Sequence, residues 1–263
     1  MPNKPVAAPG NLLEGRMSEV KSALIPKLWS LPSRIHRRLG DGAGRQRLMD
    51  EEGHLLVILH QPPAASDHER REAVLFWRSP EGDWKSTPPG GGLAAMDSLL
   101  TSYATLIANL DRRVDTATSA RNYFDILREL NPLLRSTRNL HAVIQATREA
   151  RSDDQRLIAL RDRAVELERA AELSNTDAKN GLDFTLAENA RIQARAAEQA
   201  NAEARRLNRL VACFFPLATL VAVFGMNDPE AVLGMPGFWL IIGAGMLIGA
   251  IILLTGGRKR GSD

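Results

Sequence analysis

Two long apolar runs near the C-terminus constrain this chain more than any other feature. The first extends from Val211 to Phe224, and the second extends from Met235 to Thr255 without a charged residue. At about 1.5 Å rise per residue, a helix over the second run matches a hydrocarbon core of about 30 Å. The first run is shorter and spans a bilayer only as the end of a longer helix whose arginines stay at the headgroups. The pattern predicts a membrane hairpin.

Charges around the hairpin predict its orientation. Basic residues stand outside both runs, whereas the connecting loop is acidic: Arg205, Arg206 and Arg209 precede the first run, Arg258, Lys259 and Arg260 follow the second, and Asp228 and Glu230 lie between them. The positive-inside rule then places both chain ends in the cytoplasm and the loop outside. No apolar run near the start resembles a signal peptide. We therefore expect a multi-pass protein of the cell (inner) membrane with a cytoplasmic N-terminal part.

The whole chain divides into eight expected segments. They are a disordered or weakly helical segment (1–44), a small β-containing part (45–92), cytoplasmic helices (93–151), a stalk helix (152–209), a first transmembrane helix (210–226), an external loop (227–235), a second transmembrane helix (236–255) and a basic cytoplasmic tail (256–263).

Local signals within the cytoplasmic part are unequal in strength. Strands are predicted over 54–60, 73–77 and 84–86, the last two as a hairpin. His54 and His60 are too far apart along their strand to share a metal ion and are interpreted as strand-end residues. The basic cluster at 34–38 is interpreted as a solvated linker, with contact to anionic lipid or nucleotide as the alternative.

Helical spacing of apolar residues begins at Leu93. Asn131-Pro132 is interpreted as a cap followed by a first-turn proline. Ser152 and the acidic residues after it predict the capped start of the stalk. From there no strong stop occurs before Gly225, and Gly181 is the interior glycine of this long helix. Alanine and charge dominate the stalk surface, so symmetry-related helices can approach closely.

At the first apolar run the residues resemble a known family. Phe214-Phe215-Pro216-Leu217 followed by Phe224-Gly225-Met226-Asn227 is similar to the CorA-type divalent cation channels, which carry a proline midway along the first span and Gly-Met-Asn at its outer end. The resemblance implies a mainly α membrane protein. A small N-terminal α/β cytoplasmic domain would precede a long helical stalk, which continues into the first of two C-terminal transmembrane helices. It also implies assembly as a homopentamer in a lipid bilayer.

The motif has a physical interpretation as an outer selectivity site. A ring of Asn227 amide oxygens can hydrogen-bond the waters that Mg²⁺ holds tightly, and so binds the metal through ion-bound water. Gly225 lets the helix end, and Met226 is a flexible apolar filler. Asp228 and Glu230 would form acidic rings that concentrate cations. Counting back along the family pattern gives the expected pore-lining and gate residues Asn201, Ala204, Leu207, Val211, Phe215 and Ala218.

These observations predict passive transport of hydrated divalent cations, Mg²⁺ first and Co²⁺ or Ni²⁺ as further cargo, driven inward by the membrane potential. We expect no cofactor, no enzyme activity and no nucleic-acid partner. One alternative is a signal-gated, CorA-like effector pore whose N-terminal domain responds to a nucleotide or partner. A zinc transporter is another. The chain departs from the family pattern at Ala218, where a polar pore residue is usual, and after the triplet, where Asp228-Pro229 follows.

Overall fold

The computed structural model describes residues 25–39, 42, 44–63, 72–87, 91–225, 243, 245 and 247. The chain forms two compact units, Met1–Leu186 and Ala187–Asp263. The predicted external loop, the basic tail and all but three residues of the second predicted span lie outside the described residues. The elements are α2 (Ser33–Arg38), β1 (Arg47–Glu51), β2 (His54–His60), β3 (Ala73–Arg78), β4 (Trp84–Ser86), α3 (Gly92–Thr116), α4 (Ala120–Ala150) and α5 (Arg156–Gly225).

A four-stranded antiparallel sheet forms the centre of the first unit, in the order β1-β2-β3-β4. Its register places Leu56 of β2 between Met49 of β1 and Trp77 of β3. The strands at 54–60, 73–78 and 84–86 confirm the three predicted strands, and the antiparallel pairing of the last two confirms the predicted hairpin. The sequence missed β1, which pairs with β2 through a tight turn where Glu52 has φ 53° and Gly53 has φ 82°. Positive φ at both positions is typical of the turns that join adjacent antiparallel strands.

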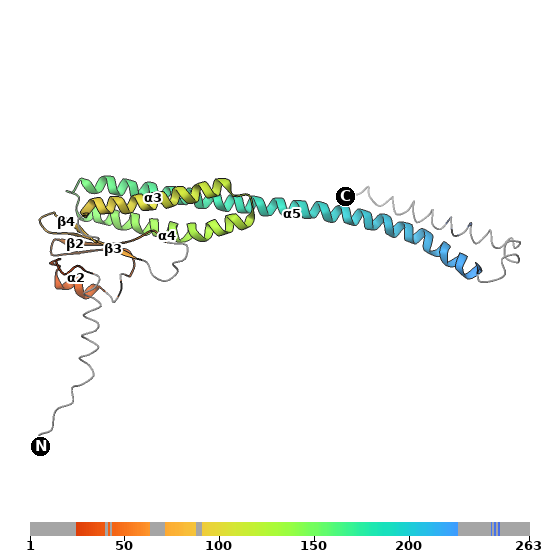
Figure 1. The fold of residues 1–263 in the computed structure, drawn as a ribbon, viewed down its shortest axis with the longest axis horizontal. Helices are drawn as coiled ribbons and strands as arrows, with labels where there is room; N and C mark the ends of the chain where they lie inside the picture. The colour runs from red at the N-terminus through yellow and green to blue at the C-terminus, as the bar shows by residue number, and fades with distance from the viewer. Residues whose placement is uncertain are drawn as a thin grey trace, which may run out of the picture. The chain divides into compact units, whose positions relative to one another are not determined.

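Both faces of this sheet are buried, which explains why β2 reads as a continuous apolar run. Side chains along β2 and β3 point alternately to the two faces of the sheet. One set, which includes Val57 and Phe76, packs on the helices α3 to α5. The other set, including Leu56 and Trp77, packs on Ile35 of α2 and on Trp29. Figure 1 shows α2 on one side of the sheet and the long helices on the other.

The segment at 25–39 corrects the interpretation of its basic cluster as a solvated linker. Ile35 is fully buried, and Ile25, Trp29 and Leu39 are nearly so. The arginines of α2 face outward, and Arg38 donates to Glu51 of β1 over 3.1 Å. The sequence pattern was misleading because two prolines interrupt the apolar positions, so no helical or strand period is visible.

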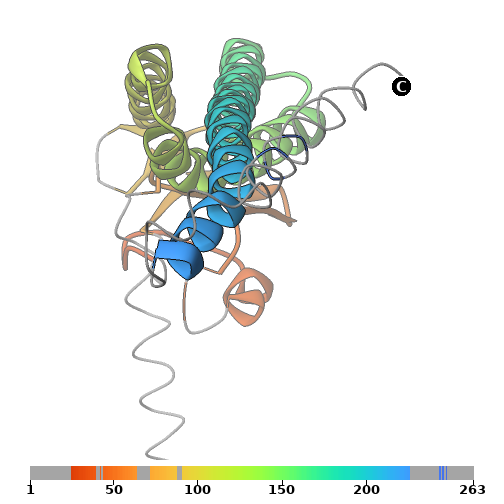
Figure 2. The ribbon, with the colours of Figure 1, turned by 90° about the vertical axis from the view of Figure 1, so that its right-hand side faces the viewer.

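Three helices cover the other face of the sheet. Helices α3 and α4 contact the strands directly, and the first part of α5 packs with them on the same side of the sheet (Figure 2). Tyr103 of α3 fixes the helices to the sheet, since its hydroxyl donates to the His60 carbonyl over 3.0 Å and contacts Ser136 Oγ of α4 at 2.7 Å. Gly181 of α5 makes room for the Tyr123 ring, because a Cβ at Gly181 would lie 2.5 Å from the nearest ring atoms.

Two helix boundaries differ from the sequence prediction. Pro132 lies inside α4 and does not start a helix. The side chain of Asn131 accepts a hydrogen bond from Asn175 of α5 over 3.0 Å and therefore does not act as a cap. Packing of α4 against both α3 and the sheet offsets the hydrogen bond that a proline removes. The long helix starts at Arg156, not at Ser152.

Candidate pore-lining helix

The predicted transport residues centre on the end of α5. This helix continues without interruption to Gly225, as the absence of a strong stop signal predicted, and Gly225 is its last residue. Met226, Asn227, Asp228 and Glu230 lie outside the described residues. The structure therefore positions the first residue of the Gly-Met-Asn triplet, and the remainder of the predicted selectivity site stays a prediction.

The six predicted pore-lining positions are all exposed on α5. Leu207 is 62% exposed, Val211 52% and Phe215 68%, and the side chains of Asn201, Ala204 and Ala218 are also exposed. Steps of three and four residues keep the six on one side of a helix. Large apolar side chains in a row on a helix surface indicate a surface that another molecule covers.

Most of the remaining helix surface is polar or small, but Ile192, Leu210 and Phe214 are also exposed. Every described side chain from Asn189 to Val211 is exposed. Among them Arg191 is held by Glu188, one turn earlier, over 2.6 Å. Near the end, the Thr219 hydroxyl donates to the Phe215 carbonyl over 2.8 Å, so its polar group is satisfied within the helix. The alanine-rich stretch 189–206 has little apolar area to bury by itself.

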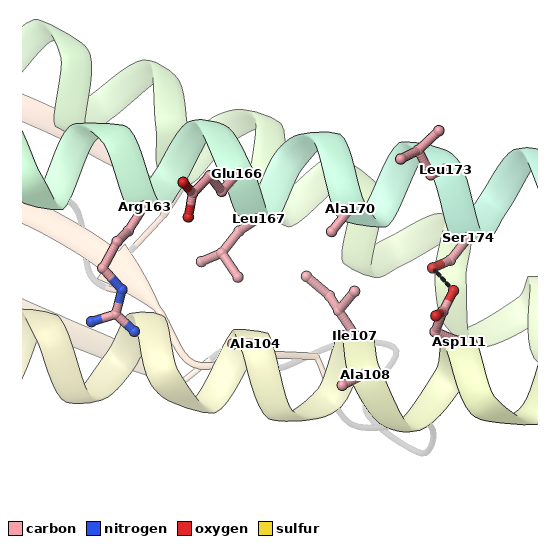
Figure 3. Close-up of a pocket in the computed structure, with 10 residues that line it drawn as sticks. All are labelled: Ala104, Ile107, Ala108, Asp111, Arg163, Glu166, Leu167, Ala170, Leu173 and Ser174. Atoms are coloured by element: carbon pink, nitrogen blue, oxygen red, sulfur yellow. Dashed lines mark hydrogen bonds between the residues drawn. The ribbon is translucent and has the colours of Figure 1, made fainter.

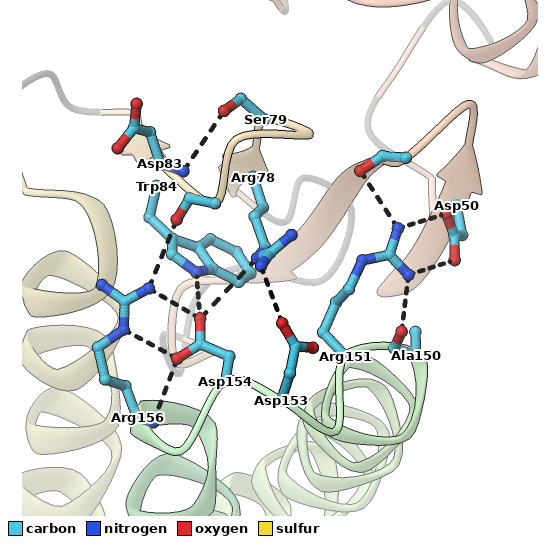
Figure 4. Close-up of polar contacts among 12 residues, drawn as sticks. Asp50, Arg78, Ser79, Asp83, Trp84, Ala150, Arg151, Asp153, Asp154 and Arg156 are labelled. Carbon is cyan, nitrogen blue, oxygen red and sulfur yellow. Dashed lines mark hydrogen bonds and ion pairs between the residues drawn. The ribbon is translucent and has the colours of Figure 1, made fainter.

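The start of α5 is fixed much more firmly. Asp154, whose side chain is 4% exposed, is the centre of this junction. Its carboxylate accepts hydrogen bonds from the Arg156 guanidinium over 2.8 and 2.9 Å, from the Trp84 indole over 3.0 Å and from the Arg156 backbone over 3.2 Å. Arg78 of β3 lies 3.9 Å from the same carboxylate. Figure 4 shows these groups converging on the turn between α4 and α5.

The same turn is bound to a second hairpin of the sheet. Arg151 donates to both carboxylate oxygens of Asp50 over 3.0 Å and to the Gly53 carbonyl over 3.2 Å (Figure 4). The turn that starts α5 is thus tied to the β1–β2 turn through Arg151 and to the β3–β4 hairpin through Asp154. The sequence pattern does not reveal this role of Asp154, because the acidic residues after Ser152 indicate only the first turn of a capped helix.

Hydrogen bonding lowers the pKa of Asp154 to about 2. The Arg156 guanidinium is the main cause, and the Trp84 indole adds to it against the opposing effect of burial. Asp154 is therefore ionised throughout the physiological pH range, and the junction is a structural ion cluster.

The two histidines of β2 are also structural: Nδ1 of His54 accepts from the Trp77 indole over 3.1 Å, and Nε2 of His60 lies 2.9 Å from the Gly44 carbonyl oxygen.

Two properties of the described residues bear on the predicted membrane and metal chemistry. Within them, no helix combines the length and apolar character required to cross a membrane. They also hold no group of three or more His, Cys, Asp or Glu side chains arranged for a metal ion.

Comparisons with known proteins concern the fold. No family model and no curated protein matches the chain. Among solved structures, full-length CmaX protein is similar, with 17% sequence identity and a TM-score of 0.55 over 90% of this chain and 85% of that chain. The CorA magnesium transporter from Methanocaldococcus jannaschii is also found, with 14% identity and a TM-score of 0.49 over 94% of this chain and 88% of that chain.

The likeness to CmaX shows that this chain has the same fold as that protein, a small sheet with helices followed by one very long helix.

Proposed function

We propose that this chain is one subunit of a membrane channel of the CorA type, which passes hydrated divalent cations into the cytoplasm. Mg²⁺ is the first cargo, with Co²⁺ and Ni²⁺ as related ions, and the membrane potential supplies the driving force. The subunits would assemble as a homopentamer in the cell membrane with both chain ends in the cytoplasm.

One observation carries this proposal. The helix α5 leads from the folded N-terminal unit to Gly225, the first residue of Gly-Met-Asn, and bears a row of exposed apolar side chains just before it. A single helix cannot enclose a conduit, so a row of this kind needs copies of itself around an axis. Leu207, Val211 and Phe215 would then narrow the conduit, and an apolar constriction closes a pore by excluding water.

Asn227 supplies the chemistry at the outer end in this proposal. A magnesium ion gives up its waters reluctantly, so a neutral carboxamide that accepts hydrogen bonds from those waters holds the ion without trapping it. Asp228 and Glu230 would raise the cation concentration at the entrance, an effect that salt weakens.

The test is growth and metal uptake in a magnesium-requiring strain that expresses the full chain. Asn227→Ala should reduce Mg²⁺ uptake at least tenfold while the protein level in the membrane is unchanged. Asn180→Ala, on an exposed part of α5, is the matched control and should transport like the wild type. Equal transport by Asn227→Ala and the wild type would remove the triplet from the mechanism.

The same strain separates the two alternatives. Uptake of zinc but not of magnesium would favour the zinc transporter. Failure to rescue magnesium starvation, together with toxicity that appears only when a ligand is supplied, would favour the signal-gated pore.

A further inference from the structure

A closed ring imposes a condition on the surface of each subunit. Subunits related by a rotation other than a two-fold meet through two different faces, so each copy must present two patches that fit one another. If the chain forms the ring proposed above, its first unit should carry such a pair. Two grooves that flank α5 within Met1–Leu186 meet this condition.

The first groove lies between α3 and α5 and has a volume of about 470 Å³. Figure 3 shows Asp111 and Glu166 on its opposite walls, with the apolar Ile107 and Leu167 between them. Asp111 accepts a hydrogen bond from Ser174 over 2.6 Å. In the described part of the chain, neither Asp111 nor Glu166 is paired with a cation. We call this surface the acidic groove.

Two further residues of the acidic groove define its character. Arg163 also lines it, but its guanidinium is already paired with Asp97 of α3, so it does not offset the two carboxylates. Leu173 lies at the rim and is 57% exposed, which leaves an apolar contact surface beside the charges.

The second groove lies between α4 and α5, has a volume of about 590 Å³ and carries the opposite charge. Arg135 and Arg138 come from α4, and Lys179 comes from α5. Arg138 is occupied by Glu172 over 2.6 Å. For Arg135 and Lys179, the described residues provide no carboxylate within ion-pair distance. We call this surface the basic groove.

We propose that the basic groove of one copy docks against the acidic groove of the next copy around the ring. Arg135 and Lys179 would approach Asp111 and Glu166 of the neighbour, and Leu173 would be covered. This inference rests on the proposed function, because it takes the ring from that proposal and assigns its contact faces.

The charges would act mainly on specificity. An exposed ion pair contributes only about 0–1 kcal/mol, but complementary charge steers encounter and disfavours wrong partners. Like faces repel in this arrangement, since two basic grooves or two acidic grooves would bring equal charges together. A two-fold dimer through either groove is therefore disfavoured, and the ring contact is favoured.

Cross-linking of the full chain tests the assignment. The background is Cys213→Ala, which removes the native cysteine. Glu166→Cys and Lys179→Cys are added to the same chain, and the detergent-solubilised particle is treated with a short bismaleimide. The two positions are thirteen residues apart on α5, about 20 Å, so a short reagent cannot join them within one chain. Adjacent copies should be joined successively, giving a ladder that ends at the size of the whole ring.

Single-cysteine variants provide the decisive control. Glu166→Cys alone and Lys179→Cys alone should give no cross-linked dimer, because each groove meets a different surface. A second control combines Glu166→Cys with Arg34→Cys, since α2 lies on the opposite side of the sheet, and this pair should remain uncross-linked (Figure 1).

The outcomes separate this inference from the proposed function. A particle with the expected subunit number but no ladder overturns the groove assignment and leaves the channel proposal standing. Dimers from a single-cysteine variant also overturn it, since they indicate a two-fold contact. A monomeric wild-type particle overturns both.

Charge reversal gives a second, independent measurement. Arg135→Glu with Lys179→Glu should reduce the assembled fraction at least severalfold in low salt, as measured by mass photometry. Adding Glu166→Lys should restore part of it. Loss of assembly that the added substitution leaves unchanged, in protein whose circular dichroism matches the wild type, would contradict the pairing.

Discussion

Asp154 is a buried carboxylate at the point where the sheet meets the start of α5. Its pKa is lowered to about 2 because Arg156 and Trp84 donate hydrogen bonds to the charged form. A carboxylate whose pKa is lowered by folding stabilises the folded state at every pH above its ordinary pKa near 3.8. That contribution is lost as the pH falls from about 4 to about 2.

We expect Asp154→Asn to lower the free energy of unfolding of the first unit by about 2 kcal/mol at neutral pH, the value that corresponds to this pKa shift. The variant should also lack most of the loss of stability that the wild type shows between pH 4 and pH 2. Thermal unfolding of the full chain followed by tryptophan fluorescence measures both, since Trp84 contacts the carboxylate.

The neighbouring Asp153 is the matched control for that experiment. Its side chain is 73% exposed and lies 3.6 Å from Arg78. Asp153→Asn should therefore change the melting temperature by much less. Equal effects of the two substitutions on the melting temperature would mean that burial and hydrogen bonding of Asp154 do not stabilise the folded state.

At the scale of elements, α5 contains the row of apolar side chains proposed to close the pore. Replacement of one of them by a small polar residue favours water in the constriction. We expect Val211→Ser to raise the resting cation flux severalfold and to slow closure, as measured by stopped-flow uptake in proteoliposomes.

Leu210→Ser is the control for this prediction. Leu210 is 54% exposed, nearly the same as Val211, but lies on a different side of the helix. If both substitutions raise the flux equally, the effect comes from helix destabilisation and the assigned register is wrong.

The sequence predicted long, strongly patterned elements better than short ones. The continuous helix to Gly225 was predicted because no strong stop interrupts more than sixty residues. By contrast, β1 was missed because Arg47, Asp50 and Glu51 leave only two apolar residues in it. Burial of Met49 depends on α2 on the far side of the sheet, which no local pattern reveals.

Of the candidate site, too, only some features could be predicted from the sequence. Local residues suffice to recognise the triplet and the apolar row. The two grooves and the Asp154 junction could not be predicted, because they join residues from helices and hairpins far apart in the sequence. Trp84 and Asp154, for example, are 70 residues apart.

At the scale of the whole molecule, passive conduction would make the rate of Mg²⁺ uptake depend on the membrane potential. A dication crossing the membrane gains about 2.3 kcal/mol per charge per 100 mV, and twice that in total. Collapse of the potential with valinomycin and potassium should therefore reduce the initial rate of Mg²⁺ uptake by cells at least tenfold.

Dissipation of the proton gradient at constant potential should leave that rate unchanged. Nigericin provides this condition in the same cells. A rate that follows the proton gradient instead would exclude passive conduction and favour a coupled transporter.

The described sheet is covered on both faces, so only its outer strands remain open to another chain. Exposed backbone at such strands invites pairing between copies, and a ring holds several copies at high local concentration. One outer strand, β4, is only three residues long, and the other, β1, carries three charged side chains among its five residues. Short or charged edge strands of this kind disfavour strand pairing between copies, so neighbouring subunits can lie close together without forming a continuous intermolecular β-sheet.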